Sequence, residues 1–337
     1  MYQVRIVAAR YGGPEVLEPR EEPVPKPGRG EVRVRIEAAG VAYADLLMRQ
    51  GLYPGGPQPP FTPGYDLVGR VDALDPALEE EPGARVAALS VSGSYAQYLC
   101  LPAGQLVRVP PELDAAEAVC LVLNYVTAWQ MLHRAARVRE GDAILVHGAS
   151  GGVGTALTEL ARLAGVTVFG TASRAKHAAI AHLGARLIDY RTEDFVARVK
   201  EWTKGAGVQA VFDPVGGANL RRSYRCLARR GRLIVYGAIS MTGRGRLKGY
   251  LSGAGSFLRL GLLDLLPDGR RARFYSILQM KRAHPAWFRD DLAHLFELLA
   301  GQRIRPVIAA RLPLPEAARA HLMLEEGSAT GKIVLIP

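Results

Sequence analysis

A glycine-rich turn between an apolar run and a helical pattern is the feature of this sequence best suited to phosphate binding. The run AILVH (143–147) is followed by four glycines within seven residues and then by small residues at helical spacing. Glycines permit a tight turn, and the start of a helix offers free N–H groups to a pyrophosphate. Read from Ala149, the spacing is A-x-G-x-x-G, a dinucleotide fingerprint with Ala in place of its first Gly. The residues predicted to hold the pyrophosphate are Ala149, Ser150, Gly151, Gly152, Val153 and Gly154. A purely structural turn is the alternative.

The residues after the second strand indicate which dinucleotide is bound. An NAD site usually has an acidic residue about 20 positions beyond the motif, where it binds the ribose 2′-hydroxyl. Here VTVFG runs into TASRAKH, and the next acidic residue is Asp189. Ser173, Arg174 and Lys176 are instead predicted to face an adenosine 2′-phosphate, with Tyr190 closing over it. Cations are unfavourable in the first turn of a helix, which favours a phosphate partner over a solvated surface. The predicted cofactor is NADPH.

Two kinds of pattern indicate the elements that position these residues. Apolar runs alternate with helical stretches after Gly141, which predicts a doubly wound parallel sheet, a Rossmann domain, over residues 125–305. The runs are AILVH, VTVFG, ARLID, VQAVFD and RLIVYG. Residues 1–124 read as short alternating strands broken by Pro and Gly, and residues 306–337 have the same character. The expected fold is α/β, with a β-rich unit in the first part of the chain that the tail resembles more than it resembles the middle.

The part of the chain after Gly237 is less regular. A helix is expected in SFLRLGLLDLL, a strand in FYSIL, and a second helix over 286–300. Fifteen Lys or Arg and two acidic residues lie between 221 and 282, a local balance of +13 in a chain of net charge +11. Such a basic segment is a solvated face or a surface for an anionic partner. No nucleic-acid-binding motif occurs, so nucleic acid is not an expected partner.

Composition favours a cytoplasmic protein. No targeting signal is recognisable, and no uninterrupted apolar run reaches the roughly 18 residues that a membrane span needs. Three scattered cysteines indicate a reducing compartment. The seven histidines form no HxH or HExxH cluster and are expected at the surface or at helix ends, so no metal site is predicted.

Without a metal as Lewis acid, polarising a simple ketone or alcohol is difficult. Quinones and alkenes conjugated to a carbonyl remain as hydride acceptors. The site must then orient the acceptor and stabilise a developing oxyanion. Tyr53 and Tyr43 are the candidate hydroxyl donors, and packing aromatics are the alternative for both.

The stretch GDAILVHGASGGVGTALTELAR (141–162) is similar to the signature of the quinone oxidoreductase and zeta-crystallin branch of the zinc-independent medium-chain dehydrogenase/reductase superfamily. It departs at Glu159, where that signature has Gln. GVAYADLLMRQGLYP, TPGYDLVGRV, FDPVGG, GRLIVYGA and ATGKIVLIP resemble further family segments, while 243–272 does not. RQGLY, LNYVTAW, VFGTAS and IDY resemble the synaptic-vesicle amine-transport protein homologues of that branch.

The resemblance implies a GroES-like catalytic domain joined to a Rossmann domain that binds NADPH. The residues that it places at the nicotinamide are Thr127, Val215 and Gly237. Tyr53 matches a family position and Tyr43 does not. Ala42 stands where the family often has Asn, and Leu47 where some members have Tyr, departures that bear on catalysis more than on cofactor binding.

Zinc-dependent members of the superfamily carry Gly-His-Glu where this chain has Gly64-Tyr65-Asp66, and no cysteine lies near residue 40. The leading hypothesis is therefore a zinc-independent, NADPH-dependent oxidoreductase that transfers hydride to a quinone. An enoyl or 2-alkenal reductase of the same fold is the alternative among enzymes. An NADPH-binding membrane-surface protein with little catalysis is the alternative from another class. A homodimer is expected. SFLRLGLLDLLPDGRRARF (256–274) is expected to be a lid over the substrate pocket, part of a dimer interface or, less favoured, an amphipathic contact with an anionic membrane, and the role of 243–272 as a whole stays open.

Overall fold

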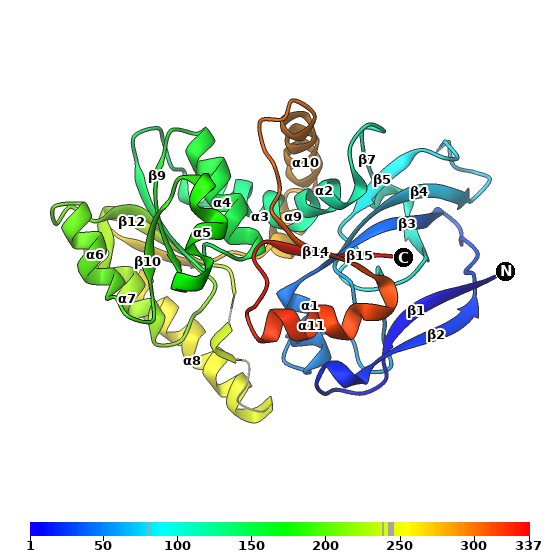
Figure 1. Ribbon diagram of the computed structural model, residues 1–337, viewed down its shortest axis with the longest axis horizontal. Helices are drawn as coiled ribbons and strands as arrows, with labels where there is room; N and C mark the ends of the chain where they lie inside the picture. Colours follow the sequence, from blue (N-terminus) through cyan, green and yellow to red (C-terminus); the bar gives the residue numbers. More distant parts are fainter. Residues whose placement is uncertain (80, 238, 242–245) are drawn as a thin grey trace. The chain divides into compact units, whose positions relative to one another are not determined.

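The computed structural model describes residues 1–79, 81–237, 239–241 and 246–337. It divides into two compact units (Figure 1). Unit 1 comprises Met1–Val126 and Arg289–Pro337, and unit 2 comprises Thr127–Phe288. The units therefore change at Val126 and Arg289, whereas the sequence prediction changes domain at residues 124 and 306. The boundaries of the functional domains stay a prediction.

Unit 2 contains a six-stranded parallel sheet in the order β10-β9-β8-β11-β12-β13. Its strands are β8 (Ala143–His147), β9 (Thr167–Ala172), β10 (Arg186–Asp189), β11 (Val208–Asp213), β12 (Leu227–Val235) and β13 (Arg271–Phe274). Its principal helices are α4 (Gly152–Leu163), α5 (His177–Ile180), α6 (Phe195–Trp202), α7 (Asn219–Arg225), α8 (Arg246–Asp264) and α9 (Ile277–Ala283). Figure 1 shows α4 and α5 on one face of this sheet and α6 and α7 on the other. This confirms the predicted doubly wound sheet.

The order of connections fixes where unit 2 can bind a ligand. The chain runs from β8 through α4 to β9 and then to β10, and returns to β11 on the other side of β8. The helices that follow β8 and β11 therefore lie on opposite faces of the sheet. In open parallel sheets, ligands bind at the carboxyl ends of the strands where the order reverses. Here that point lies between β8 and β11.

The predicted strand FYSIL is wrong for most of its length. Strand β13 ends at Phe274, and the Ser276 hydroxyl accepts a hydrogen bond from the backbone N–H of Gln279. That bond caps α9, so Ile277 and Leu278 are helical. The predicted helix SFLRLGLLDLL belongs to the longer α8, and residues 242–245 before it lie outside the described residues.

Unit 1 is built on a seven-stranded sheet in which six strands have the order β14-β15-β3-β4-β5-β7 and the seventh, β6, pairs with β3. Its strands are β3 (Glu31–Val41), β4 (Asp66–Leu74), β5 (Arg85–Ala88), β6 (Tyr98–Pro102), β7 (Val107–Arg108), β14 (Ile308–Pro313) and β15 (Lys332–Ile336). Strands β1 (Tyr2–Ala8) and β2 (Leu17–Pro23) form a separate antiparallel pair. The helices are α1 (Tyr43–Arg49), α2 (Ala115–Cys120), α10 (Pro285–Ala300, which begins in unit 2) and α11 (Ala317–Glu325). The last strand of the chain thus completes a sheet begun by the first hundred residues, and both termini lie in this unit (Figure 1).

One continuous helical stretch of the described residues, Ala115–Ala136, is long and apolar enough to cross a membrane by length and composition. It consists of α2, a π-helical segment Leu121–Tyr125, α3 (Val126–Trp129) and a second π-helical segment Gln130–Ala136. Of its most apolar window, 78% is buried inside the protein. Core helices of soluble proteins pass the same test, so this helix is weak support for a membrane span.

Candidate functional site

The turn after β8 has the geometry of an anion site. Gly148 adopts a φ of 64°, the left-handed region that favours glycine, and its carbonyl accepts a hydrogen bond from Gly151 N–H at 2.9 Å. A Cβ at Gly154 would overlap that same carbonyl oxygen, so only glycine lets the helix start pack this closely. Gly151 precedes α4 with no side-chain cap. The first-turn N–H groups of α4 have no intrahelical acceptor and face the end of the helix. The turn therefore fits a pyrophosphate.

The residues predicted to face the 2′-phosphate follow the next two strands. Ser173 is buried directly after β9, Arg174 is exposed, and Lys176 is half-buried in the same short turn. Burial lowers the pKa of Lys176. Tyr190 follows β10 and is 55% exposed. Because Asp189 pairs with Ala172 in the sheet, Ser173 and Tyr190 leave adjacent strands at the same level. The fold thus brings the predicted cation cluster and Tyr190 to one edge.

The acidic residue at this edge is engaged by its own turn. The Asp189 carboxylate accepts hydrogen bonds from the Arg191 N–H and the Thr192 hydroxyl, both at 3.1 Å. Backbone hydrogen bonds are the main cause that lowers the pKa of Asp189. The carboxylate is therefore held as a local structural group, although it lies near the predicted phosphate position.

The predicted nicotinamide residues divide into two groups. Val215 and Gly237 follow β11 and β12, and the Ser240 N–H donates to the Val215 carbonyl at 3.0 Å. A Cβ at Gly237 would lie 2.8 Å from the Pro214 carbonyl oxygen, so the two turns are in close contact. Thr127 is 6% exposed on α3, away from these turns in the chain, and its place in the site stays a prediction.

In unit 1, the two tyrosines of the sequence hypothesis have different surroundings. The Tyr53 hydroxyl lies 2.9 Å from the Tyr65 hydroxyl, and the rings meet edge to face with centroids 6.4 Å apart. Burial, and then the neighbouring Tyr53, raise the pKa of Tyr65 far above its ordinary value, so its phenol stays neutral. Tyr43 is half-buried at the first position of α1. The structure therefore gives Tyr53 a polar partner that the sequence did not reveal.

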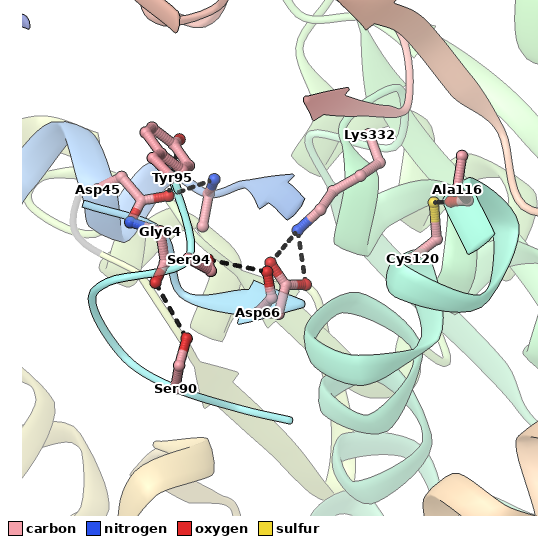
Figure 2. A network of polar contacts seen from close by, with 10 residues as sticks. Asp45, Gly64, Asp66, Ser90, Ser94, Tyr95, Ala116, Cys120 and Lys332 are labelled. Atoms are coloured by element: carbon pink, nitrogen blue, oxygen red, sulfur yellow. Dashed lines mark hydrogen bonds and ion pairs between the residues drawn. The ribbon is translucent and has the colours of Figure 1, made fainter. Parts of the chain in front are cut away.

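A buried carboxylate holds the turn that carries Tyr65. Asp45 accepts hydrogen bonds from the Ala42 N–H at 2.8 Å, the Gly64 N–H at 3.1 Å and the Tyr95 hydroxyl at 3.2 Å (Figure 2). Burial raises the pKa of Asp45 to about 7, against the lowering effect of the two N–H donors. The Tyr95 hydroxyl also lies 3.1 Å from His321 Nε2. His321 is fully buried, so the expected surface or helix-end position is wrong for this histidine.

The position of the superfamily's zinc-ligand motif is occupied by a buried ion pair. Asp66 contacts Lys332 of β15, and burial raises the pKa of Asp66 while Lys332 lowers it (Figure 2). Nearby Cys120 donates from Sγ to the Ala116 carbonyl at 3.1 Å, and burial raises its pKa to about 12, which keeps it a thiol. Among the described residues, no group of three or more His, Cys, Asp or Glu could hold a metal ion.

Comparison with known proteins agrees with this architecture. Residues 28–111 match the family described as alcohol dehydrogenase GroES-like domain, and residues 183–335 match the family described as zinc-binding dehydrogenase.

Curated relatives cover nearly the whole chain. A quinone oxidoreductase of Pseudomonas aeruginosa is 35% identical over 99% of this chain and 99% of its own length. The human synaptic vesicle membrane protein VAT-1 homolog-like is 32% identical over 98% of this chain and 80% of its own length.

A solved structure of Escherichia coli quinone oxidoreductase complexed with NADPH aligns with a TM-score of 0.88 at 29% identity, covering 99% of this chain and 100% of that one. These matches extend over both units. The chain belongs to the quinone oxidoreductase and VAT-1 homologue branch of the medium-chain dehydrogenase/reductase superfamily.

Proposed function

We propose that this protein is an NADPH-dependent oxidoreductase that transfers hydride to a quinone without zinc. The observation that carries the proposal is the turn at Gly148–Gly154, where a Cβ on Gly154 would overlap the Gly148 carbonyl oxygen, so that glycine lets the turn pack against the start of α4. Quinone oxidoreductases of the same family, one of them complexed with NADPH, support the choice of cofactor and reaction.

Three parts of NADPH are proposed to be bound by separate groups of residues in the chain. The N–H groups at the start of α4 hold the pyrophosphate through the dipole and free donors of the helix. Ser173, Arg174 and Lys176 donate charge-assisted hydrogen bonds to the 2′-phosphate, with Tyr190 beside them. Val215 and Gly237 line the nicotinamide end, as does Thr127. When bound, NADPH supplies the hydride.

Tyr53 is proposed to donate a hydrogen bond to the oxyanion that develops on the acceptor. The single proton of the Tyr53 hydroxyl is available to that oxyanion when Tyr65 is the donor in the hydrogen bond between them, and the two hydroxyls lie 2.9 Å apart. Tyr65, fixed between Gly64 and Asp66, would thereby orient Tyr53. Tyr43 remains the second candidate donor. Quinones suit this arrangement because they accept hydride without a metal to polarise them.

An enoyl or 2-alkenal reductase is the second candidate, since Tyr53 and Tyr65 offer the same donor to a conjugated carbonyl. The proposed partners are a small-molecule acceptor and a second copy of the chain. The proposed location is the cytoplasm. Leu258, Leu262 and Leu265 of the α8 region are 67%, 58% and 81% exposed and mark where a homodimer or a membrane contact would be sought.

Equilibrium titration with NADPH and NADH tests the proposal at the cofactor. The two cations and one hydroxyl proposed to bind the 2′-phosphate predict that NADPH binds at least about tenfold more tightly than NADH. Equal affinity for both would remove the assignment of Ser173, Arg174 and Lys176.

A further inference from the structure

A chain of buried polar side chains crosses the carboxyl ends of β9, β8 and β11. Its members are Thr171, His147, Ser223 and Asp213, which are 3%, 3%, 0% and 0% exposed. His147 Nδ1 lies 3.0 Å from the Thr171 hydroxyl, and His147 Nε2 lies 3.0 Å from the Ser223 hydroxyl. The Ser223 hydroxyl lies 2.7 Å from Asp213 Oδ2. The expected surface position of His147 is therefore wrong, since this histidine is a link inside unit 2.

The donors and acceptors of the chain can run in one direction only. A carboxylate accepts, so the single proton of the Ser223 hydroxyl goes to Asp213, and the Ser223 oxygen accepts from His147 Nε2–H. His147 is neutral, because burial lowers its pKa, and its Nδ1 then accepts from the Thr171 hydroxyl. The Thr171 oxygen in turn accepts from the Gly148 N–H at 3.4 Å. The tautomer of His147 follows from these partners.

Both ends of the chain reach the backbone of the proposed cofactor site. One end is Gly148, the first residue of the phosphate-binding turn. At the other end, Asp213 Oδ1 accepts from the Val215 N–H at 2.7 Å and the Gly216 N–H at 3.0 Å. Asn219 Nδ2 donates to the second carboxylate oxygen at 2.9 Å. The Asp213 carboxylate therefore accepts four hydrogen bonds, two on each oxygen, and these bonds fix its orientation.

We infer that Asp213 is a positioning residue for the nicotinamide end of NADPH, anchored through Ser223 and His147 to the turn that binds the pyrophosphate. The inference rests on the proposed function and adds to it a residue that does not touch the cofactor. Asp213 fixes the backbone at Val215 and Gly216, and the adenosine end of the cofactor is bound by other turns. Loss of the Asp213 charge should therefore weaken the binding of the nicotinamide end of NADPH and leave the binding of its adenosine end unchanged.

The test compares two ligands on one substitution. In Asp213→Asn, an amide oxygen replaces the carboxylate oxygen at the turn, so the bonds to Val215 and Gly216 lose charge assistance. NADPH should bind about three- to tenfold more weakly, as expected when charge-assisted bonds become neutral. Adenosine 2′,5′-bisphosphate, which has no nicotinamide, should bind within twofold of the wild type. Asp142→Asn is the matched control, because Asp142 accepts a hydrogen bond from the Arg139 N–H in the same unit and makes no bond to Thr171, His147, Ser223 or Asp213.

Nitrogen chemical shifts of the His147 ring give a second readout that needs no ligand. The wild type should show the Nε2–H tautomer. In Asp213→Asn the amide N–H faces the Ser223 oxygen, and the Asn219 amide must turn its oxygen toward the new N–H. The Ser223 hydroxyl proton then turns to His147 Nε2, and the ring should change to the Nδ1–H tautomer. An unchanged tautomer, an unchanged NADPH affinity, or a parallel loss for both ligands would each overturn the inference.

Ser223→Ala carries the test if Asp213→Asn does not fold, since it removes one hydroxyl and leaves the Asp213 carboxylate. NADPH should again weaken while the bisphosphate does not, and equal behaviour of the two ligands would overturn the inference. A wild-type protein that binds the bisphosphate but shows no gain from the rest of NADPH would instead contradict the proposed function. The tautomer measurement distinguishes these failures.

Discussion

Lys332 Nζ lies 2.9 Å from Asp66 Oδ2 and 3.2 Å from Asp66 Oδ1, and the two side chains are 3% and 0% exposed. The pair links the last strand of the chain, β15, to β4 across β3, which lies between them in the sheet. A Cβ at Gly40 of β3 would overlap the ends of both side chains. Glycine at position 40 therefore leaves the space in which the pair forms, and the pair holds the C-terminal strand in unit 1.

Lys332→Met should destabilise the protein strongly. The substitution leaves the Asp66 carboxylate buried without its cation, and breaking a buried pair in this way costs about 3–5 kcal/mol. Urea unfolding followed by circular dichroism measures the change. Arg311→Met is the control, because Arg311 pairs with Asp114 at the surface, where the loss should stay below about 1 kcal/mol. Similar losses in the free energy of unfolding for both variants would show that the buried Lys332 pair stabilises the protein no more than the surface pair does.

Lys176→Ala should weaken NADPH binding by about 1–3 kcal/mol and leave NADH binding unchanged, since the lost bond is to the 2′-phosphate. Isothermal titration with both cofactors measures the difference. Lys200, exposed on α6, supplies the control Lys200→Ala, which should change neither affinity. A loss shared equally by NADPH and NADH would place Lys176 away from the 2′-phosphate.

Tyr53→Phe should lower kcat/KM roughly 10- to 1000-fold and leave NADPH affinity unaltered if the phenol donates to the developing oxyanion. The loss should be greater for an enone than for a quinone, because a quinone needs less proton donation at the transition state. Steady-state kinetics with both acceptors measure it, with Tyr2→Phe at an exposed position as control. If Tyr53 only packs, Phe retains the ring and its buried area, and both acceptors should turn over as before.

The stability of the protein should depend on the protonation of Asp45. Its pKa is raised from 3.8 to about 7, so between these values the folded chain holds a proton that the unfolded chain has released. The free energy of unfolding should then fall as the pH rises through this window, by at most about 1.4 kcal/mol per pH unit, and level off above pH 7.

Asp45→Asn removes this titrating group and should flatten the profile. Urea unfolding of both proteins at pH 5, 6, 7 and 8 gives the difference, which cancels the other groups that the two chains share. The wild type should lose stability relative to the variant as the pH rises. Parallel profiles would mean that the hydrogen bonds from Ala42 and Gly64 keep Asp45 ionised throughout.

Local patterns predicted the parts of the fold that neighbouring residues determine. The apolar runs gave β8 to β12, and the glycine spacing gave the turn into α4, because each signal lies within a few residues. Ser276 shows the limit: its cap on α9 outweighed the strand-like composition of FYSIL. A single polar residue at a helix start decided that boundary.

Buried polar partners far apart in sequence could not be predicted. Asp66 and Lys332 are 266 positions apart, and His147 and Ser223 are 76 apart. Each is an ordinary polar residue in its own segment, and only the folded sheets make them neighbours. Tyr65 is recognisable in the sequence as a departure from a zinc-ligand motif, whereas its contact with Tyr53 depends on the path of the loop between them.

The rate of NADPH oxidation with a simple quinone, measured beside NADH and beside a conjugated enone, tests the proposed reaction most directly. The proposed function predicts saturable NADPH consumption that requires both the protein and the quinone, is much slower with NADH, and yields the quinol in equal amount. Tight NADPH binding without turnover of either acceptor would contradict it, and would leave a cofactor-binding protein whose fold alone is that of an oxidoreductase.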